Sequence, residues 1–216
     1  MNSFIEENYL KALFNLSNEK GEVNVNELSK KLEIKMPTVT SMMKKLSEKG
    51  LVHYESYKPI RLSDKGKKAA ALIIRKHRLT EMYLVEKMGF GWEEVHAIAE
   101  QIEHIKSIAF FDKMDQLLGF PKLDPHGSPI PNSNGEIESK HFKKLSECKV
   151  GDQVVLTAVI NTSTDFLKFL NSRALSLGTT ITVLAIESFD NSMVVSYADR
   201  SNETLSHTVC DRLLIE

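Results

Sequence analysis

Cysteine is scarce in this chain of 216 residues, which has only Cys148 and Cys210. Two distant cysteines form neither a CxxC pair nor a disulfide framework, so we expect free thiols in a reducing compartment. Long hydrophobic runs are also missing, because no stretch approaches the roughly 18 apolar residues that span a bilayer. The N-terminal segment MNSFIEENYLK is polar and acidic, unlike a secretory signal. We therefore expect a cytoplasmic protein without a membrane partner.

Several common catalytic motifs are absent as well. The sequence has no HExxH pair, no nucleophile elbow and no glycine-rich phosphate loop. Their absence predicts a protein that is not an enzyme. A metalloenzyme that uses a His/Glu cluster with an open coordination position is one alternative, and a screen for turnover would detect it.

Charge is unevenly distributed along the chain, although the formal net charge is only −1. Residues 1–78 carry 16 Lys and Arg against 9 Asp and Glu, residues 79–126 carry 4 against 9, and residues 127–216 carry 8 against 11. A basic first third is what a module that binds nucleic-acid phosphates needs. An ordinary solvated surface could show the same excess of basic residues, so charge alone does not establish nucleic-acid binding.

The first third has the pattern of three helices followed by two short strands. Apolar residues recur at helical spacing over residues 4–17, and Asn26 is a candidate N-cap for a short second helix. Pro37 suits the first turn of a third helix, where its missing N–H costs nothing. Residues 51–66 then alternate like two strands around a turn. This order predicts a winged helix-turn-helix DNA-binding domain over residues 1–63.

The third helix, from about Pro37 to Glu48, would enter the major groove of double-stranded DNA. Short hydroxyl side chains can approach base edges, and lysines can contact phosphates. The polar side of any amphipathic helix would offer similar groups, which is the alternative interpretation. The predicted DNA-binding residues are Lys35, Pro37, Thr38, Thr40, Ser41, Lys44 and Lys45.

Residues 64–122 are predicted to be helical. A long helix over about 64–88 ends at two glycines, and residues 92–119 form another helix or a broken pair. The apolar stripe of this second segment exceeds what a lone helix hairpin can bury, which favours a homodimer interface.

Residues 123–141 form a Pro/Gly-rich linker, and residues 142–216 contain several short strand-like runs. Such runs at close spacing predict a small β-barrel. The expected fold class is therefore mainly α with a β C-terminal domain.

Histidine and carboxylate side chains gather at helical spacing in the middle of the chain. Residues three or four apart share a helix face, so rows of such groups can close around a divalent ion. The row contains His77, Glu81, His96, Glu100, Glu103 and His104. A set of nitrogen and oxygen ligands without thiolate favours manganese(II) over zinc. Each histidine could instead be an ordinary helix residue.

Three segments together resemble the three-domain form of the diphtheria toxin repressor family, the iron- and manganese-dependent bacterial repressors. They are MPTVTSMMKKLSEKGLVHYE, RKHRLTEMYLVEKMGF and VHAIAEQIEHI, and the resemblance covers essentially the whole chain. It implies a winged helix-turn-helix, a helical metal-binding and dimerisation domain, and an SH3-like domain of the FeoA type at the C-terminus. It also implies a homodimer on palindromic operator DNA that controls genes for metal uptake.

The resemblance also implies two metal sites. The primary site would be formed by Asn8, His77, Glu100, Glu103 and His104. Glu100 stands where iron-type members have a cysteine, which resembles the manganese-responsive branch. Asn8 replaces the carboxylate usual there and Lys11 replaces a glutamate of some members, so the contribution of the first helix stays open, as does a binuclear site. The second site would be formed by Glu81, His96, Asp124, His126 and Asp165, and would hold the barrel against the dimerisation domain.

The predicted function is a homodimeric repressor that binds its operator when manganese(II) is bound, with iron(II) as the alternative ion. We expect the metal-free primary site to be loose, because its clustered carboxylates repel each other. The other interpretation is a metal-independent winged-helix regulator whose barrel serves as a protein-interaction module. The metal content of the purified protein would separate the two.

Overall fold

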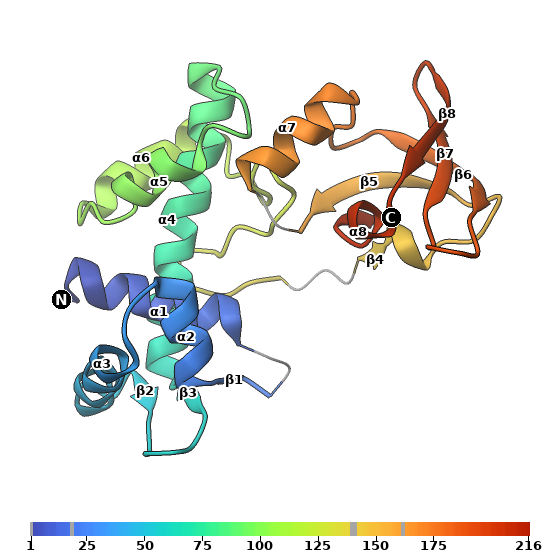
Figure 1. Cartoon of the computed structure of the whole chain (residues 1–216). Coiled ribbons are helices and arrows are strands. Elements are labelled where there is room, and N and C mark those ends of the chain that lie inside the picture. The colour runs from blue at the N-terminus through green and yellow to red at the C-terminus, as the bar shows by residue number, and fades with distance from the viewer. Residues whose placement is uncertain (1, 18–19, 139–141, 161–162) are drawn as a thin grey trace. The chain divides into compact units, whose positions relative to one another are not determined.

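The computed structural model describes residues 2–17, 20–138, 142–160 and 163–216. They form two compact units (Figure 1). The helical unit contains Met1–Thr80, Ala99–Lys122 and Ile130–Glu138, and the sheet unit contains Glu81–Ile98, Leu123–Pro129 and Ser139–Glu216. None of the described helices combines the length and hydrophobicity that crossing a membrane requires.

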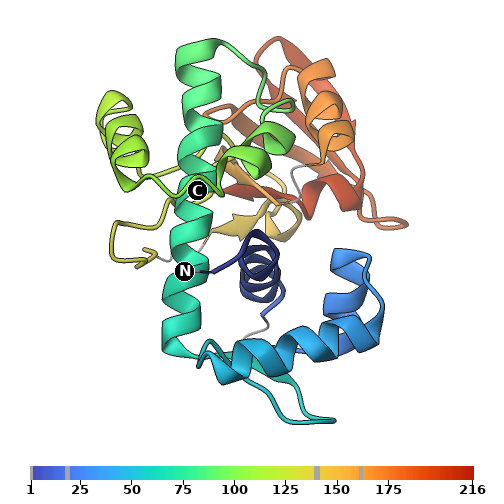
Figure 2. The same cartoon turned by 90° about the vertical axis from the view of Figure 1, so that its left-hand side faces the viewer.

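The helical unit begins with the predicted order of three helices and a wing. Its helices are α1 (Phe4–Leu16), α2 (Val25–Leu32) and α3 (Met36–Glu48). The strands β1 (Glu22–Val23), β2 (Val52–His53) and β3 (Ile60–Leu62) form an antiparallel sheet in the order β1-β3-β2. Figure 2 shows α3 lying across the end of this unit, beside the wing that β2 and β3 form.

The start of α2 differs from the prediction by two residues. The N-cap is Asn24 rather than Asn26, and its backbone N–H donates to Glu27 Oε2 over 2.8 Å. A glutamate three positions after the cap is the signature of a capping box, which Asn26 lacks.

A shared hydrophobic core holds the three helices together. Tyr9, Leu10 and Leu13 of α1 are almost completely buried, as are Leu28 of α2 and Met43 of α3. Because α3 turns its apolar stripe into this core, its hydroxyl and lysine side chains remain on the other side.

The long helix predicted over about 64–88 is α4 (Asp64–Met88), and Gly89 follows it with a φ of 73°. The next predicted segment is a broken pair, α5 (His96–Ile102) and α6 (Ile108–Leu117). The hydroxyl of Ser107 caps α6 by accepting from the N–H of Phe110. This polar start explains why one continuous helix does not form.

The sheet unit contains a six-stranded antiparallel sheet in the order β4-β9-β5-β6-β7-β8. Its elements are β4 (Lys143–Lys144), η1 (Leu145–Glu147), β5 (Gln153–Val159), α7 (Thr164–Ser172), β6 (Thr180–Ile186), β7 (Met193–Tyr197), β8 (Arg200–Leu205), α8 (His207–Cys210) and β9 (Leu213–Ile215). Leu156, Leu170 and Val195 lie in its core together with both cysteines. The prediction of helices followed by a C-terminal β domain is confirmed.

The predicted linker over residues 123–141 begins as an ordered loop. Leu123 and Pro129 pair through an antiparallel bridge, so the chain between them is held as a closed turn. Residues 139–141, the last of the predicted linker, lie outside the described part of the chain. The four-part domain division stays a prediction.

Candidate metal centres

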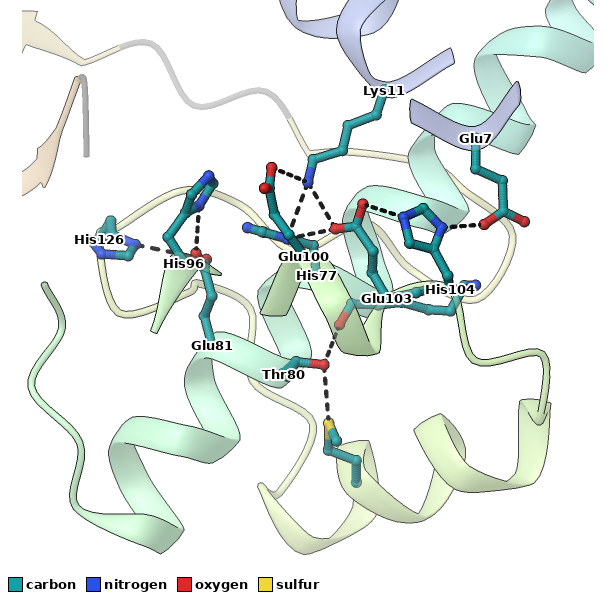
Figure 3. Close-up of polar contacts among 12 residues, drawn as sticks. Glu7, Lys11, His77, Thr80, Glu81, His96, Glu100, Glu103, His104 and His126 are labelled. Atoms are coloured by element: carbon teal, nitrogen blue, oxygen red, sulfur yellow. Dashed lines mark hydrogen bonds and ion pairs between the residues drawn. The ribbon is translucent and has the colours of Figure 1, made fainter. Parts of the chain in front are cut away.

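A polar cluster in the helical unit contains side chains from α1, α4 and the end of α5 (Figure 3). We call it the first cluster, and its members are Glu7, Lys11, His77, Glu100, Glu103 and His104. Glu103 and His104 directly follow the last turn of α5, whose helical hydrogen bonding continues from the N–H of Glu103 to the carbonyl of Ala99. The backbone position of Glu103 is therefore fixed by the helix.

The centre of the first cluster is the buried carboxylate of Glu103, which is 1% exposed. Its Oε2 lies 2.6 Å from His77 Nδ1 and 2.7 Å from Lys11 Nζ. Burial raises the pKa of Glu103, but the hydrogen bond with His77 and the charge of Lys11 outweigh it and hold the pKa below its ordinary value. The carboxylate is therefore charged and able to bind cations.

His104 has one ring nitrogen paired and one without a hydrogen bond. Its Nδ1 lies 2.6 Å from Glu7 Oε2, so a proton on Nδ1 is donated to that carboxylate. Its Nε2 is buried without a hydrogen-bond partner among the described residues and lies 3.6 Å from Glu103 Oε1. A histidine oriented by a carboxylate on one nitrogen, with the other lone pair free, is the usual arrangement of a metal ligand. The first cluster therefore fits a divalent ion.

Four of the five predicted ligands of the primary site come together in the first cluster, and Asn8 does not. Asn8 is half-buried on α1, and no polar contact of the cluster between described residues involves it. α1 contributes Glu7 and Lys11 instead, neither of which was predicted as a site residue. The signal for them was present, because residues seven and eleven are four apart and share a helix face.

A second cluster lies in the sheet unit and consists of Glu81, Asp124 and His126, all buried. Each offers a ligand atom within 4.8 Å of the others. His126 Nδ1 lies 3.7 Å from Glu81 Oε2 and 4.0 Å from Asp124 Oδ1, both longer than hydrogen bonds. His126 Nε2 lies 2.9 Å from the Trp92 carbonyl oxygen, so its proton is donated there and Nδ1 faces the carboxylates. This arrangement also fits a divalent ion.

The loop around Asp124 is shaped by its own side chain. Asp124 Oδ1 accepts from the backbone N–H groups of His126 and Ser128 at 2.8 and 2.9 Å. Gly127 has a φ of 83°, and an added Cβ would lie 2.2 Å from the Thr157 carbonyl oxygen. Only glycine fits this close approach to β5, which positions His126 next to it.

The electrostatics of the second cluster also favour a cation. Burial of its ring lowers the pKa of His126, but the two carboxylates and the Trp92 carbonyl together raise it above its ordinary value. In the metal-free cluster, the raised pKa favours a proton on His126 Nδ1, which faces the two carboxylates. A metal ion bound to Nδ1 would take the place of this proton.

The other two residues predicted for the second site are more exposed. His96 contacts Glu81 Oε1 through Nδ1 at 3.2 Å, with a side chain that is 49% exposed. Asp165 lies exposed in the first turn of α7 and is not a member of the described cluster.

The predicted DNA-binding residues lie on the solvent side of α3 or directly before it. Six of them are exposed and Thr40 is half-buried. Lys45 of α3 and Lys49, the C-cap residue that follows this helix, contact the buried carboxylate of Glu6 on α1, at 3.1 and 2.7 Å. Glu6 thus connects α1 to the helix expected to read DNA.

Three family models match most of the chain. Residues 4–60 match the iron dependent repressor N-terminal DNA binding domain, residues 63–132 match its metal binding and dimerisation domain, and residues 143–216 match the FeoA domain. The chain belongs to the iron-dependent repressor family. The resemblance predicted from the sequence is confirmed.

Individual members of the iron-dependent repressor family support the assignment over the full length. The iron-dependent repressor IdeR of Mycobacterium leprae (strain TN) is 26% identical over 230 residues, which cover 100% of this chain and 99% of the relative. A manganese-dependent transcriptional repressor in complex with manganese is 30% identical, with a TM-score of 0.86 and coverage of 97% of this chain and 98% of that one. ScaR with bound zinc is 32% identical, with a TM-score of 0.79 and 98% of both chains covered.

Proposed function

We propose that the protein is a metal-activated repressor that binds operator DNA as a homodimer. The observation that carries this proposal is the first cluster, in which ligand-type side chains from three helices surround a buried carboxylate. Its α1 residues lie on the same helix as Glu6, which contacts α3. A change in the cluster can therefore alter the position of the helix that reads DNA.

The residues that would hold the ion of the first cluster are Glu103 and His104, with His77 and Glu100 beside them. The ion would supply a divalent charge that binds nitrogen and oxygen ligands from different helices together. Glu7 orients His104 through Nδ1 and so connects α1 to the ligand set. Asn8 stays a further candidate, because an amide oxygen is a neutral hard ligand.

We propose manganese(II) as the activating ion and iron(II) as the alternative. The ligand-type side chains of both clusters are imidazoles and carboxylates, and the cysteines lie buried in the core of the sheet unit. Ligands of this type suit manganese better than a thiolate-rich zinc site does. Two of the similar structures contain manganese and zinc, respectively. The second cluster would hold another ion through Glu81, Asp124 and His126, with His96 and Asp165 as additional ligands.

The proposal assigns a role to each segment of the chain. Residues 1–63 would bind a palindromic operator through α3, and residues 64–122 would bind metal and form the dimer. Residues 142–216 would form the SH3-like domain beyond the linker at 123–141. By analogy with the family, the controlled genes would include those for metal uptake.

Fluorescence anisotropy of labelled operator DNA tests this function at a stated salt concentration, because phosphate contacts make the affinity depend on salt. We expect chelator to abolish specific binding and manganese(II) chloride to restore it. A parallel titration with iron(II) under exclusion of oxygen decides between the two ions. Operator binding that chelator leaves unchanged would contradict the proposal and favour the metal-independent regulator.

A further inference from the structure

The ammonium group of Lys11 lies inside the first cluster, among imidazole and carboxylate groups that could bind a metal ion (Figure 3). Its Nζ lies 2.7 Å from Glu103 Oε2, 3.1 Å from His77 Nδ1 and 3.6 Å from Glu100 Oε1. The Lys11 side chain is only 12% exposed. Its charge therefore acts on the cluster with little screening by water.

This position accounts for how the carboxylates can be close together without an ion. A buried carboxylate is costly unless a positive group pairs with it, and Lys11 pairs with Glu103. The expectation of a loose metal-free site considered the repulsion between carboxylates but not this lysine. With the ammonium present, α1 is held to Glu103, which follows α5, by an ion pair rather than pushed away from it.

The place of the ammonium also limits what else can bind. It contacts both Glu103 and Glu100, so an ion that bridged these two carboxylates would need the space that Nζ occupies. Lys11 contacts the Oε2 atom of Glu103, whereas His104 Nε2 lies near the other oxygen, Oε1. Among the described residues, no ammonium group contacts Oε1 or His104 Nε2. One divalent ion can therefore bind there while Lys11 remains.

We propose that Lys11 is a built-in cation of the first cluster, which takes the place of a second metal ion and competes with the first for Glu103. The inference rests on the proposed function, since it concerns the same metal site. It assigns the cluster one divalent ion per chain. It also makes Lys11 the residue that sets the metal concentration to which the protein responds, because its charge weakens metal binding.

Direct metal-binding measurements on full-length variants test the inference without any DNA. The His126→Ala substitution removes a ligand of the second cluster, so that the remaining sites can be counted. In this background, equilibrium dialysis against manganese(II) chloride followed by elemental analysis should give one ion per chain. Lys11→Glu, which replaces the cation by another ligand, should raise the count to two. Lys11→Met should keep one ion but lower its dissociation constant about tenfold, as expected for removing a nearby positive charge.

Two further variants control for effects on the fold. Lys11→Arg keeps the charge and should stay close to the parent in both count and affinity. Lys11→Gln keeps a hydrogen-bond donor without the charge, and should bind manganese as tightly as Lys11→Met. Thermal unfolding followed by circular dichroism identifies any variant that does not fold. If one of the two uncharged variants does not fold, the manganese affinity of the other tests the inference.

The outcomes separate this inference from the proposed function. A count that stays at one in Lys11→Glu overturns the inference, as does an unchanged or weaker manganese affinity in the folded uncharged variants. If the parent chain with His126→Ala binds no manganese at all, the primary site itself fails, and the proposed function fails with it.

Discussion

Two adjacent glutamates of α1 have different partners. Glu7 contacts His104 in the first cluster, whereas Glu6 contacts Lys45 of α3 and its C-cap residue Lys49. Burial raises the pKa of Glu6, but hydrogen bonds from Lys49, Ser3 and Lys45 lower it to about 2. One residue thus connects α1 to the C-terminal end of α3, while its neighbour belongs to the first cluster.

The depressed pKa of Glu6 predicts how stability depends on pH. The folded state holds the charged form, so the stabilisation is complete above the unfolded pKa of about 4.5 and is lost as the pH falls toward about 2. We expect Glu6→Gln to lower the free energy of unfolding at pH 7 by about 1–2 kcal/mol, allowing for screening of the exposed lysines.

Urea unfolding of the metal-free protein between pH 7 and pH 3 measures this effect. The difference between Glu6→Gln and the parent should shrink as the pH falls. Glu48→Gln, on the exposed side of α3, serves as the control and should change little. A difference between Glu6→Gln and the parent that is constant over this range would refute the assignment.

At the scale of elements, sequence patterns predicted those whose apolar spacing is regular. The helices α1, α3 and α4 were predicted to within one residue at their ends, and α3 was correctly expected to bury one face. The sequence pattern does not indicate β8, because RSNETL is polar and lacks the alternation of a half-buried strand. It lies at the end of the sheet and, among the described strands, pairs only with β7, so its side chains are mostly solvated.

The candidate sites show a similar limit. Helical spacing and the family resemblance indicated four members of the first cluster, because those residues lie in α4, in α5 or directly after α5. Glu7, which contacts His104, precedes the predicted Asn8 by one position, which corresponds to about 100° around a helix, and Asn8 itself stays a prediction. The side chain that reaches His104 depends on how α1 packs against α4 and α5, and such long-range packing is not contained in local spacing.

The exposed lysines of α3 predict how operator binding depends on salt. If Lys44 contacts a phosphate, Lys44→Ala should weaken binding to all sequences and reduce the slope of log K against log salt by about one. Anisotropy titrations at several salt concentrations, with manganese(II) present, measure the slope. Lys168→Ala on α7 is the matched control, and an equal change there would show that the effect is one of overall charge.

At the scale of the whole molecule, the account requires two copies of the chain. α6 leaves Ile108, Phe110 and Leu117 exposed by 78%, 43% and 52%. Several large apolar side chains left exposed on one short helix are typical of a region that another protein chain covers. Since the proposed palindromic operator would have two half-sites, a second copy of this chain is the partner that fits the proposal.

Charging this surface should separate the copies. We expect Ile108→Asp to be monomeric in sedimentation equilibrium at micromolar concentration and to bind operator DNA at least about tenfold more weakly, since only one half-site is then held. Phe189→Asp is the control, because Phe189 is 99% exposed in the sheet unit. If Ile108→Asp remained dimeric, the interface would have to lie elsewhere.

The central claim is that metal binding and operator binding are coupled through the first cluster. Such coupling is reciprocal, so the factor by which manganese(II) tightens operator binding must equal the factor by which operator DNA tightens manganese binding. The most direct test measures the manganese dissociation constant by calorimetry, with and without saturating operator, for the parent and for Glu103→Gln. We predict clearly tighter manganese binding with operator in the parent, by that same factor, and no such gain in Glu103→Gln. Equal manganese affinity with and without operator in the parent would contradict the account.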